Sequence, residues 1–359
     1  MRHWILLACA FVGTAGWGQS VKTIVFTNGK PVLGLPVPGE RAKAHCAVDG
    51  ITYFEGLADQ DAGAAANLYG VSTDGEVKSL RRKLPEGFSE VRVLDFFAGE
   101  HEAVSLLEAE RRDDNSRRVT ETSYFLSIAD HDGDFSKLIS MDVKFRPLKV
   151  GMFGSGEVLV LGWDTGNLLP VLVAMKEDGS VRRFVDLDER GLERDGRGAG
   201  TITTEDRETV LKDLQGAAFV SYGAELLVTY PGTGRGIRVL SGTGLSRTIP
   251  MLLPGGYVLR DVLVSEGRGL LVLRVKPALA SDEKKRAPDS DVRMFEVNAT
   301  RGDLIRELMF RRPRMTEVTC ATGYSLTAIF LEPVARPEAT KAVDEPMQLV
   351  VSKVPRNGR

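Results

Sequence analysis

Cysteine and histidine are scarce in this sequence. Three cysteines and four histidines occur in 359 residues, and neither residue type recurs at the spacing of a metal site. We therefore expect neither a disulfide scaffold nor a zinc centre, and stability must come from a hydrophobic core. Cys46 and Cys320 leave two alternatives open, a single disulfide or two free thiols.

The chain also lacks an excess of charge of one sign. Its 47 basic and 49 acidic residues give a formal net charge of −2. This near balance argues against a nucleic acid or an anionic membrane surface as the partner. We expect a monomer whose partner is another protein or a small anionic ligand.

Catalytic and cofactor motifs are missing as well. No serine stands in a Gly-x-Ser-x-Gly sequence, and the glycine-rich stretch from Gly232 to Gly236 lacks the context of a phosphate-binding loop. We expect no cofactor, with calcium as the one alternative. Asp130, Asp132 and Asp134 could supply oxygen ligands, but the distal glutamate of a calcium loop is absent and the same residues suit an ordinary hairpin turn.

No apolar run at the N-terminus is long enough to cross a bilayer. The run from Trp4 to Val12 follows a basic start and precedes small residues that end at Gly18. This order is typical of a secretory signal, so we predict a signal peptide at 1–18 and a mature domain at 19–359, in the periplasm or outside the cell. The alternative is a lipoprotein that carries its lipid on Cys9.

A repeat recurs six times along the mature chain. Each copy has a short β-patterned run, a turn with glycine, and a second run rich in Val, Leu and Ile, which indicates a strand buried on both faces. The turn glycines are Gly50, Gly99, Gly156, Gly223, Gly267 and Gly323. A third run follows each second run, and most third runs lead into a further turn such as Asp74-Gly75 or Asp178-Gly179, which indicates a hairpin to a fourth strand.

The repeat predicts an all-β fold, a six-bladed β-propeller of four-stranded antiparallel blades. The last blade lacks a fourth strand of its own, and we predict that Lys22 to Thr27 supplies it and closes the ring. The pattern resembles the secreted β-propellers of bacteria. This resemblance rests on turn glycines and strand pattern, so it implies an architecture and no particular activity.

Long connections fall on one face of the predicted propeller. Loops after the second and fourth strands of a blade emerge on the same face, because successive strands alternate in direction. The long segments are Glu110 to Thr122, Asp188 to Leu214, Lys276 to Asp291 and Glu332 to Pro346. Glu205 to Leu214 suits a short helix with Thr204 as its cap. We expect binding on this face, although each charged segment taken singly suits a solvated insertion.

Basic residues recur near the start of the innermost strands. Aligning these strands by their turn glycines places Lys43, Arg92, Lys149 and Arg260 seven residues before the glycine. If these side chains converge at the mouth of the central channel of the predicted propeller, their positive charges would attract an anionic ligand. The alternative is that they are separate, solvated charges.

Two functions follow from the sequence. The first is an exported, non-catalytic binding or scaffolding propeller that uses the long-loop face. The second is a hydrolase or lactonase-like enzyme whose polar residues line the channel, and its candidate residues are His45, Asp95, Asp261 and Glu317.

Overall fold

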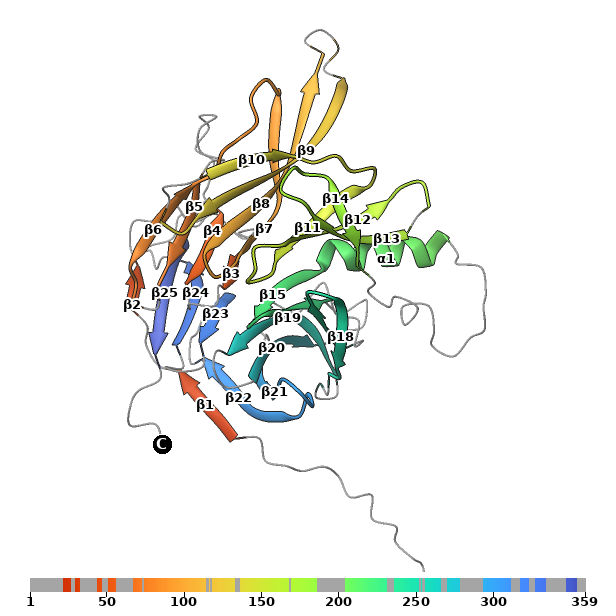
Figure 1. Ribbon diagram of the computed structural model, residues 1–359. Helices are drawn as coiled ribbons and strands as arrows, with labels where there is room; N and C mark the ends of the chain where they lie inside the picture. The colour runs from red at the N-terminus through yellow and green to blue at the C-terminus, as the bar shows by residue number, and fades with distance from the viewer. Residues whose placement is uncertain are drawn as a thin grey trace, which may run out of the picture.

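The computed structural model describes the chain in separate stretches. These are residues 22–26, 30–32, 44–46, 51–55, 67–72, 74–113, 116, 118–132, 136–167, 169–185, 204–230, 236–251, 253, 256–265, 270–277, 293–310, 317–322, 327–333 and 347–353. Strands dominate these stretches (Figure 1).

Five antiparallel sheets in the described residues contain four strands each. The first two comprise β3 (Ala44–Cys46), β4 (Thr52–Glu55), β5 (Asn67–Val71) and β6 (Val77–Arg81), and then β7 (Glu90–Ala98), β8 (Glu102–Arg112), β9 (Val119–Asp130) and β10 (Ser136–Ser140). The next two comprise β11 (Arg146–Met152), β12 (Val158–Asp164), β13 (Leu169–Met175) and β14 (Val181–Phe184), and then β15 (Ala218–Tyr222), β16 (Glu225–Thr229), β17 (Ile237–Ser241) and β18 (Gly244–Ile249). The fifth comprises β23 (Glu317–Thr322), β24 (Thr327–Pro333), β25 (Met347–Lys353) and β2 (Lys30–Val32).

One further sheet has five strands. It comprises β19 (Tyr257–Ser265), β20 (Leu270–Pro277), β21 (Arg293–Asn298), β22 (Leu304–Phe310) and β1 (Lys22–Phe26). The first four are antiparallel, whereas β1 lies parallel to β22. The expected uniform set of six four-stranded blades is therefore corrected to five such blades and one five-stranded sheet.

The sheets are arranged as a propeller. The innermost strands β3, β7, β11, β15, β19 and β23 contact one another in this order, and β23 also contacts β3. Each sheet therefore packs between two neighbours, which explains why the second strands are almost continuously apolar. In β12, for example, every residue from Val158 to Trp163 is buried.

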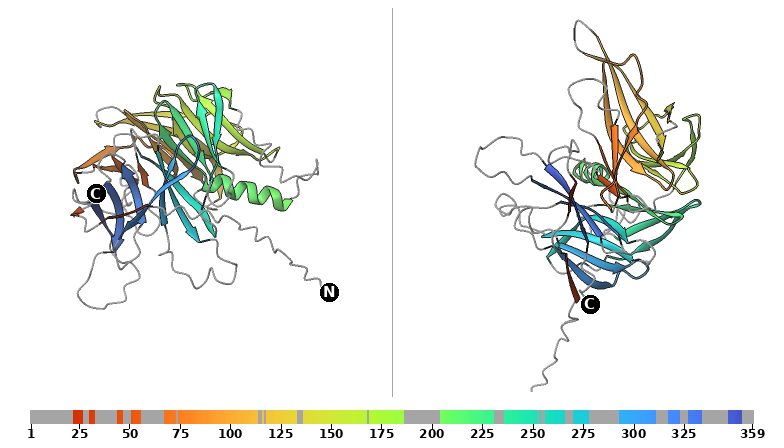
Figure 2. Two further views of the ribbon diagram at one scale, coloured as in Figure 1. Left: turned by 90° about the horizontal axis from the view of Figure 1, so that it is seen from below. Right: turned by 90° about the vertical axis from the view of Figure 1, so that its left-hand side faces the viewer.

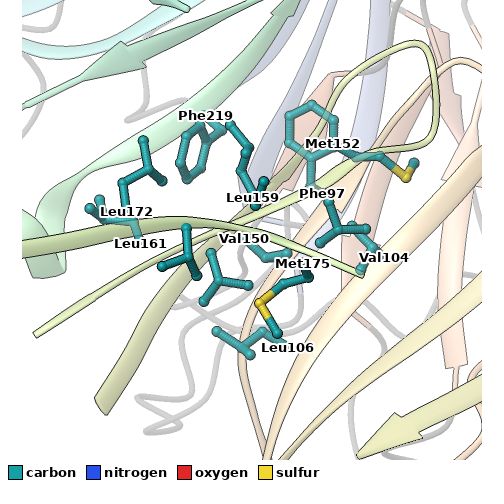
Figure 3. Close-up of a cluster of buried hydrophobic side chains, with 14 of the residues drawn as sticks. Phe97, Val104, Leu106, Val150, Met152, Leu159, Leu161, Leu172, Met175 and Phe219 are labelled. Atoms are coloured by element: carbon teal, nitrogen blue, oxygen red, sulfur yellow. The ribbon is translucent and has the colours of Figure 1, made fainter. Parts of the chain in front are cut away.

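The largest core cluster among the described residues lies between adjacent sheets. Phe97 and Leu106 from one sheet pack with Val150, Leu159 and other apolar side chains from the next (Figure 3). Phe219 extends the cluster to the sheet of β15. Neighbouring blades are thus held together by apolar burial, which is the dominant favourable term in folding.

The N-terminal closure differs from the prediction in one respect. The segment Lys22 to Thr27 does not complete the last blade, because its strand β1 pairs with β22. The last blade is completed instead by β2, in which Pro31 lies opposite Val350 of β25. A three-residue strand with a central proline gives almost no sequence signal, yet proline is tolerated on an edge strand whose N–H has no ladder partner.

The segment Glu110 to Thr122 also differs from the prediction of a long loop. Strand β8 continues to Arg112 and β9 begins at Val119, and the two remain paired out to Arg112 opposite Val119. These outer parts of β8 and β9, from Glu110 to Thr122, are called the ribbon below. The ribbon projects beyond the sheets at the top of Figure 1, and the right-hand view of Figure 2 shows the same projection. The mixed charges of the segment are typical of a solvated loop, but here they are divided between two paired strands.

The predicted helix is confirmed as α1 (Thr204–Gly216), which packs through Leu214 and partly buried Val210 and Leu211. It contacts β11, β12 and β13. In the described part of the chain, no helix is long and apolar enough to cross a membrane. The rest of Asp188 to Leu214 and most of Lys276 to Asp291 and Glu332 to Pro346 lie outside the described residues, as do Gly50, Gly267 and Gly323.

The two N-terminal strands should differ in their effect on folding. A chain that begins at residue 28 loses only the extra strand β1 and should still unfold in one cooperative transition. A chain that begins at residue 34 also loses β2, which leaves the edge of β25 open, and should unfold less cooperatively or aggregate. Thermal denaturation followed by circular dichroism checks this, and identical transitions for the two chains would contradict the role given to β2.

Candidate functional site

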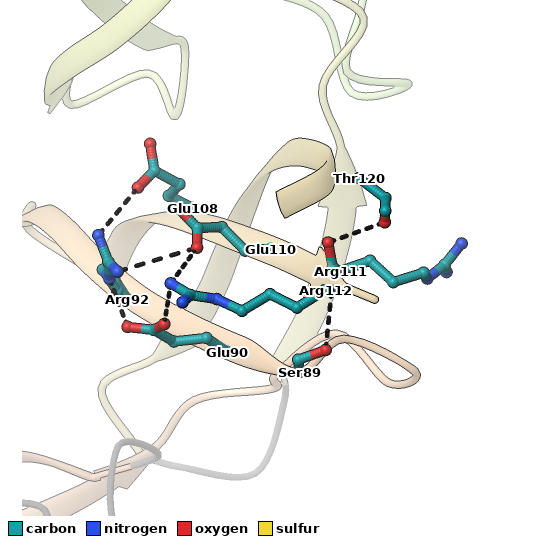
Figure 4. Close-up of polar contacts among 8 residues, drawn as sticks. All are labelled: Ser89, Glu90, Arg92, Glu108, Glu110, Arg111, Arg112 and Thr120. Carbon is teal, nitrogen blue, oxygen red and sulfur yellow. Dashed lines mark hydrogen bonds and ion pairs between the residues drawn. The ribbon is translucent and has the colours of Figure 1, made fainter. Parts of the chain in front are cut away.

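An arginine–glutamate network lies where β7 begins and β8 ends, along one side of the projecting ribbon. Its members are Glu90, Arg92, Glu108, Glu110 and Arg112 (Figure 4). Arg92 lies opposite Glu108, and Glu90 lies opposite Glu110. Since successive side chains of a strand alternate between its faces, all five are on one face of the sheet.

The network offsets an unfavourable pairing of like charges. Two glutamates directly opposite each other on neighbouring strands destabilise a sheet. Here Arg112 Nη2 lies 2.8 Å from Glu90 Oε2 and 2.7 Å from Glu110 Oε2, so one guanidinium bridges both carboxylates. Arg112 therefore offsets the repulsion between Glu90 and Glu110, and Arg92 lies close to both carboxylates as well.

Arg92 is surrounded by carboxylates. Its Nε lies 2.6 Å from Glu90 Oε1, and its terminal nitrogens lie 3.9 Å from Glu108 Oε1 and 3.8 Å from Glu110 Oε2. The hydrogen bond from Arg92 lowers the pKa of Glu90 below its ordinary value, and the same bond raises the pKa of Arg92. Three carboxylates against two guanidiniums leave the five side chains of the network with one formal negative charge.

Tyr124 of β9 lies opposite Glu108, on the same face. Burial raises the pKa of the Tyr124 phenol, and the negative charge of Glu108 raises it further. Tyr124 is therefore a neutral phenol at ordinary pH and borders the network beside Glu108.

The opposite face of the ribbon carries a second set of contacts. Arg111 Nη1 lies 2.8 Å from Glu121 Oε2, and Arg111 Nε donates to the carbonyl of Gly87 over 3.2 Å. The Arg111 guanidinium also lies 5.0 Å from the centre of the Phe88 ring, and Phe88 packs edge-on against Phe125. The residues before β7 thus fasten the ribbon from its β8 side.

Asp95 connects two innermost strands at the centre of the propeller. Its Oδ2 accepts a hydrogen bond of 3.1 Å from the backbone N–H of Val150, and its Oδ1 lies 3.6 Å from Lys149 Nζ. Both Asp95 and Lys149 follow irregularities in strand pairing, which change the direction of side chains. Of the residues predicted for an enzyme, Asp95 thus takes part in a contact between blades.

The predicted basic residues do not occupy equivalent places. Arg92 lies five steps of the strand ladder before the end of β7, whereas Lys149 lies three steps before the end of β11, so they differ in height by about 7 Å. The turn-glycine alignment misses this because Gly99 directly follows its strand and Gly156 does not. Arg260 is half-buried in β19, and Lys43 lies outside the described residues. A shared anionic ligand stays a prediction.

The other predicted residues are placed only in part. His45 lies in β3, Asp261 in β19 and Glu317 in β23, but the side chains of His45 and Glu317 are outside the described part. Cys46 and Cys320 lie in β3 and β23, which contact each other, and their side chains are likewise outside it.

The predicted calcium ligands are also placed only in part. Asp130 ends β9, Asp132 follows in the turn, and Asp134 is outside the described residues. No group of three or more His, Cys, Asp or Glu side chains suited to a metal occurs among the residues that were described.

Most of the arginine–glutamate network was not predicted from the sequence. Only Arg92 was singled out, for a different role. The sequence signal for the other four residues is a charged side chain at every second position. It occurs at Glu90 and Arg92 and again at Glu108, Glu110 and Arg112. Such spacing places charges on one face of a strand.

The pKa of Glu90 should depend on Arg92. Replacing Arg92 with Gln removes the hydrogen bond and the positive charge, so the pKa of Glu90 should rise toward the ordinary value. Because its folded-state pKa is lowered, Glu90 stabilises the fold above the ordinary glutamate pKa, and this effect is lost as the pH falls through the lowered value. An NMR titration of the Glu90 carboxyl carbon measures it. Arg111→Gln, on the opposite face, is the control and should leave this pKa unchanged.

Asp95 should stabilise the fold mainly through its backbone contact. Asp95→Ala leaves the Val150 N–H without this acceptor and should lower the free energy of unfolding by about 1–3 kcal/mol. Lys149→Met removes only the ion pair and should cost less. Chemical denaturation measures both variants, and a larger loss for Lys149→Met would show that the ion pair is the more important contact.

No family model matches the sequence, and no curated protein matches it. Solved structures with a similar fold include a phage phi92 endosialidase, at 8% identity over 91% of this chain and 68% of that chain, with a TM-score of 0.46. A catalytically inactive virginiamycin B lyase from Staphylococcus aureus matches at 8% identity over 91% and 98% of the two chains, with a TM-score of 0.40. A protein of unknown function from Bacteroides caccae matches at 10% identity over 75% and 82%, with a TM-score of 0.41. These likenesses are too weak to assign an activity.

Proposed function

We propose that this chain is an exported, non-catalytic binding or scaffolding propeller whose recognition element is the ribbon of β8 and β9. In this proposal residues 19–359 form one closed domain, and the signal at 1–18 is removed on export. The partner is another protein, bound on the face where the connections after second and fourth strands emerge.

The ribbon is the observation that carries this proposal. It extends β8 and β9 beyond the neighbouring strands and exposes polar side chains on both faces, including Glu121 and Thr122. An element that contributes so little to the core is expected to have a role outside it, because binding residues concentrate on projections held by a rigid scaffold.

The charges of the ribbon favour a protein partner over a small anion. The exposed guanidinium of Arg92 is already surrounded by Glu90, Glu108 and Glu110. An anion would have to displace these carboxylates or be repelled by them. Asp95, a candidate for the enzymatic alternative, is likewise engaged by Val150 and Lys149.

Shortening the ribbon tests this function. Residues 110–122 are replaced by Asn-Gly, which joins the directly opposed Ala109 and Ser123 in a two-residue turn. The shortened protein should fold normally but lose a partner that the intact protein captures from periplasmic and culture extracts. The matched control replaces the exposed turn Gly223-Ala224, on the opposite face, with the same Asn-Gly and should retain the partner.

Two results would contradict the proposal. One is equal capture of the same partner by the intact and the shortened protein. The other is a metal in the purified protein together with hydrolytic activity that the shortened protein retains, which would favour a channel-site enzyme.

A further inference from the structure

The outer part of β9 has an open edge. Strand β10 pairs with β9 only at Phe125 and beyond, and Met141 then donates its N–H to the Tyr124 carbonyl. From Val119 to Ser123, β9 is paired with β8 alone within the described part of the chain. Among the residues that the structure describes, no strand pairs with this edge over those five residues.

The backbone groups of Thr122 face this open edge. The Tyr124 carbonyl points toward β10, and residues two apart in a strand direct their backbone groups to the same side. On the other side of the ribbon, the N–H of Ser89 donates to the Glu110 carbonyl, so Glu110 faces away from β9. Since Glu110 lies opposite Thr122, both observations leave the Thr122 N–H and carbonyl directed outward.

The two edges of the ribbon differ in how far their backbone groups are hydrogen-bonded. On the β8 edge, Ser89 bonds to Glu110 and its Oγ accepts the N–H of Arg112, while Gly87 accepts from Arg111. The β9 edge has no such cover in the described residues. Proteins usually protect exposed edges with lysine, proline or a covering loop. The free stretch of β9 contains neither lysine nor proline, and Val119, Thr120 and Thr122 favour strands.

We propose that the β9 edge binds an extended segment of a partner protein as an added strand, with basic side chains on the segment. This rests on the proposed binding function and names how the partner is held. Unpaired backbone groups in a strand select an extended backbone, and alternate side chains give specificity. The face with Tyr124 carries the net negative network, so basic residues on that face of the added strand meet opposite charge. On the other face Glu121 is exposed, and its Oε2 lies 2.8 Å from Arg111 Nη1.

A second copy of this chain fits the edge less well. Symmetric pairing about Glu121 would place two Glu121 carboxylates opposite each other, which is unfavourable. Symmetric pairing about Thr122 would carry the hairpin of the second copy past Tyr124, where Met141 already occupies the edge. A separate, short segment meets neither obstacle.

The test uses a synthetic peptide of alternating lysine and valine, six residues long and blocked at both ends. Titrated into the full chain and followed by NMR, it should bind saturably and shift the backbone signals of Thr122 and its neighbours. An otherwise identical peptide with glutamate in place of lysine should bind about tenfold more weakly, because attractive cross-strand pairs become repulsive.

A matched pair of variants isolates the backbone contact. Thr122→Pro removes the outward N–H without removing a bond to β8 and should abolish binding of the lysine peptide, whereas Thr122→Val keeps the N–H and should bind it normally. If Thr122→Pro does not fold, a lysine peptide methylated on alternate backbone nitrogens provides the same test on the unaltered protein. One of its two methylation patterns should lose binding and the other should keep it.

Several results would overturn the proposal. They are failure of the lysine peptide to bind, binding that Thr122→Pro leaves intact, and a dimer in sedimentation that Thr122→Pro dissociates, which would assign the edge to a second copy. A partner that the ribbon captures equally well with Thr122→Pro would leave the binding function standing and remove only the added-strand mechanism.

Discussion

Apolar burial between adjacent sheets is the constraint on which the rest of this structure depends. Each sheet contributes strands that are buried on both faces, and clusters such as that of Phe97, Val150 and Leu159 join one sheet to the next. At about 25 cal/mol for each Å² of apolar surface removed from water, contacts of this kind dominate the stability of the fold. Polar contacts such as that of Asp95 with Val150 add direction to this packing.

The same packing explains how the ribbon can project. Residues near the base of β8 and β9, including Val104, Leu106 and Leu126, are buried in the core cluster. The outer residues add no apolar burial and are held by the strand ladder, by the Arg112 bridge and by the stacking of Arg111 on Phe88. A rigid base and a polar, strand-paired extension make an element suited to recognition.

How far the sequence predicted the structure depended on how each feature is encoded. Buried second and third strands were predicted closely, because runs such as Val158 to Trp163 carry an unmistakable apolar pattern. The turn at Asp178-Gly179 was predicted from its dipeptide, and Gly179 has the positive φ of 83° that the pair implies. These features depend on local sequence alone.

Features that depend on distant partners were predicted poorly. β1 pairs with β22 and β2 pairs with β25, each at the edge of a sheet whose other strands come from the C-terminal part of the chain. The residues of β1 and β2 do not themselves indicate which edge each strand joins. The ribbon was not predicted because its charged residues are typical of a loop. In the structure these charges are paired, with Arg111 beside Glu121 and Arg112 beside Glu110. The basic residues were aligned by turn glycines that do not mark equivalent positions.

We infer that the ribbon of β8 and β9 is ordered and open on one side in the free protein. Amide hydrogen exchange of the isolated chain tests this most directly, because neighbouring amides of β9 face opposite sides. We expect slow exchange at Ser123, whose N–H faces β8, and fast exchange at Thr122, whose N–H faces the open edge. Slow exchange at both would show that the edge is already covered, and fast exchange at both would show that the ribbon is not formed. Either result would contradict an ordered ribbon with one open edge.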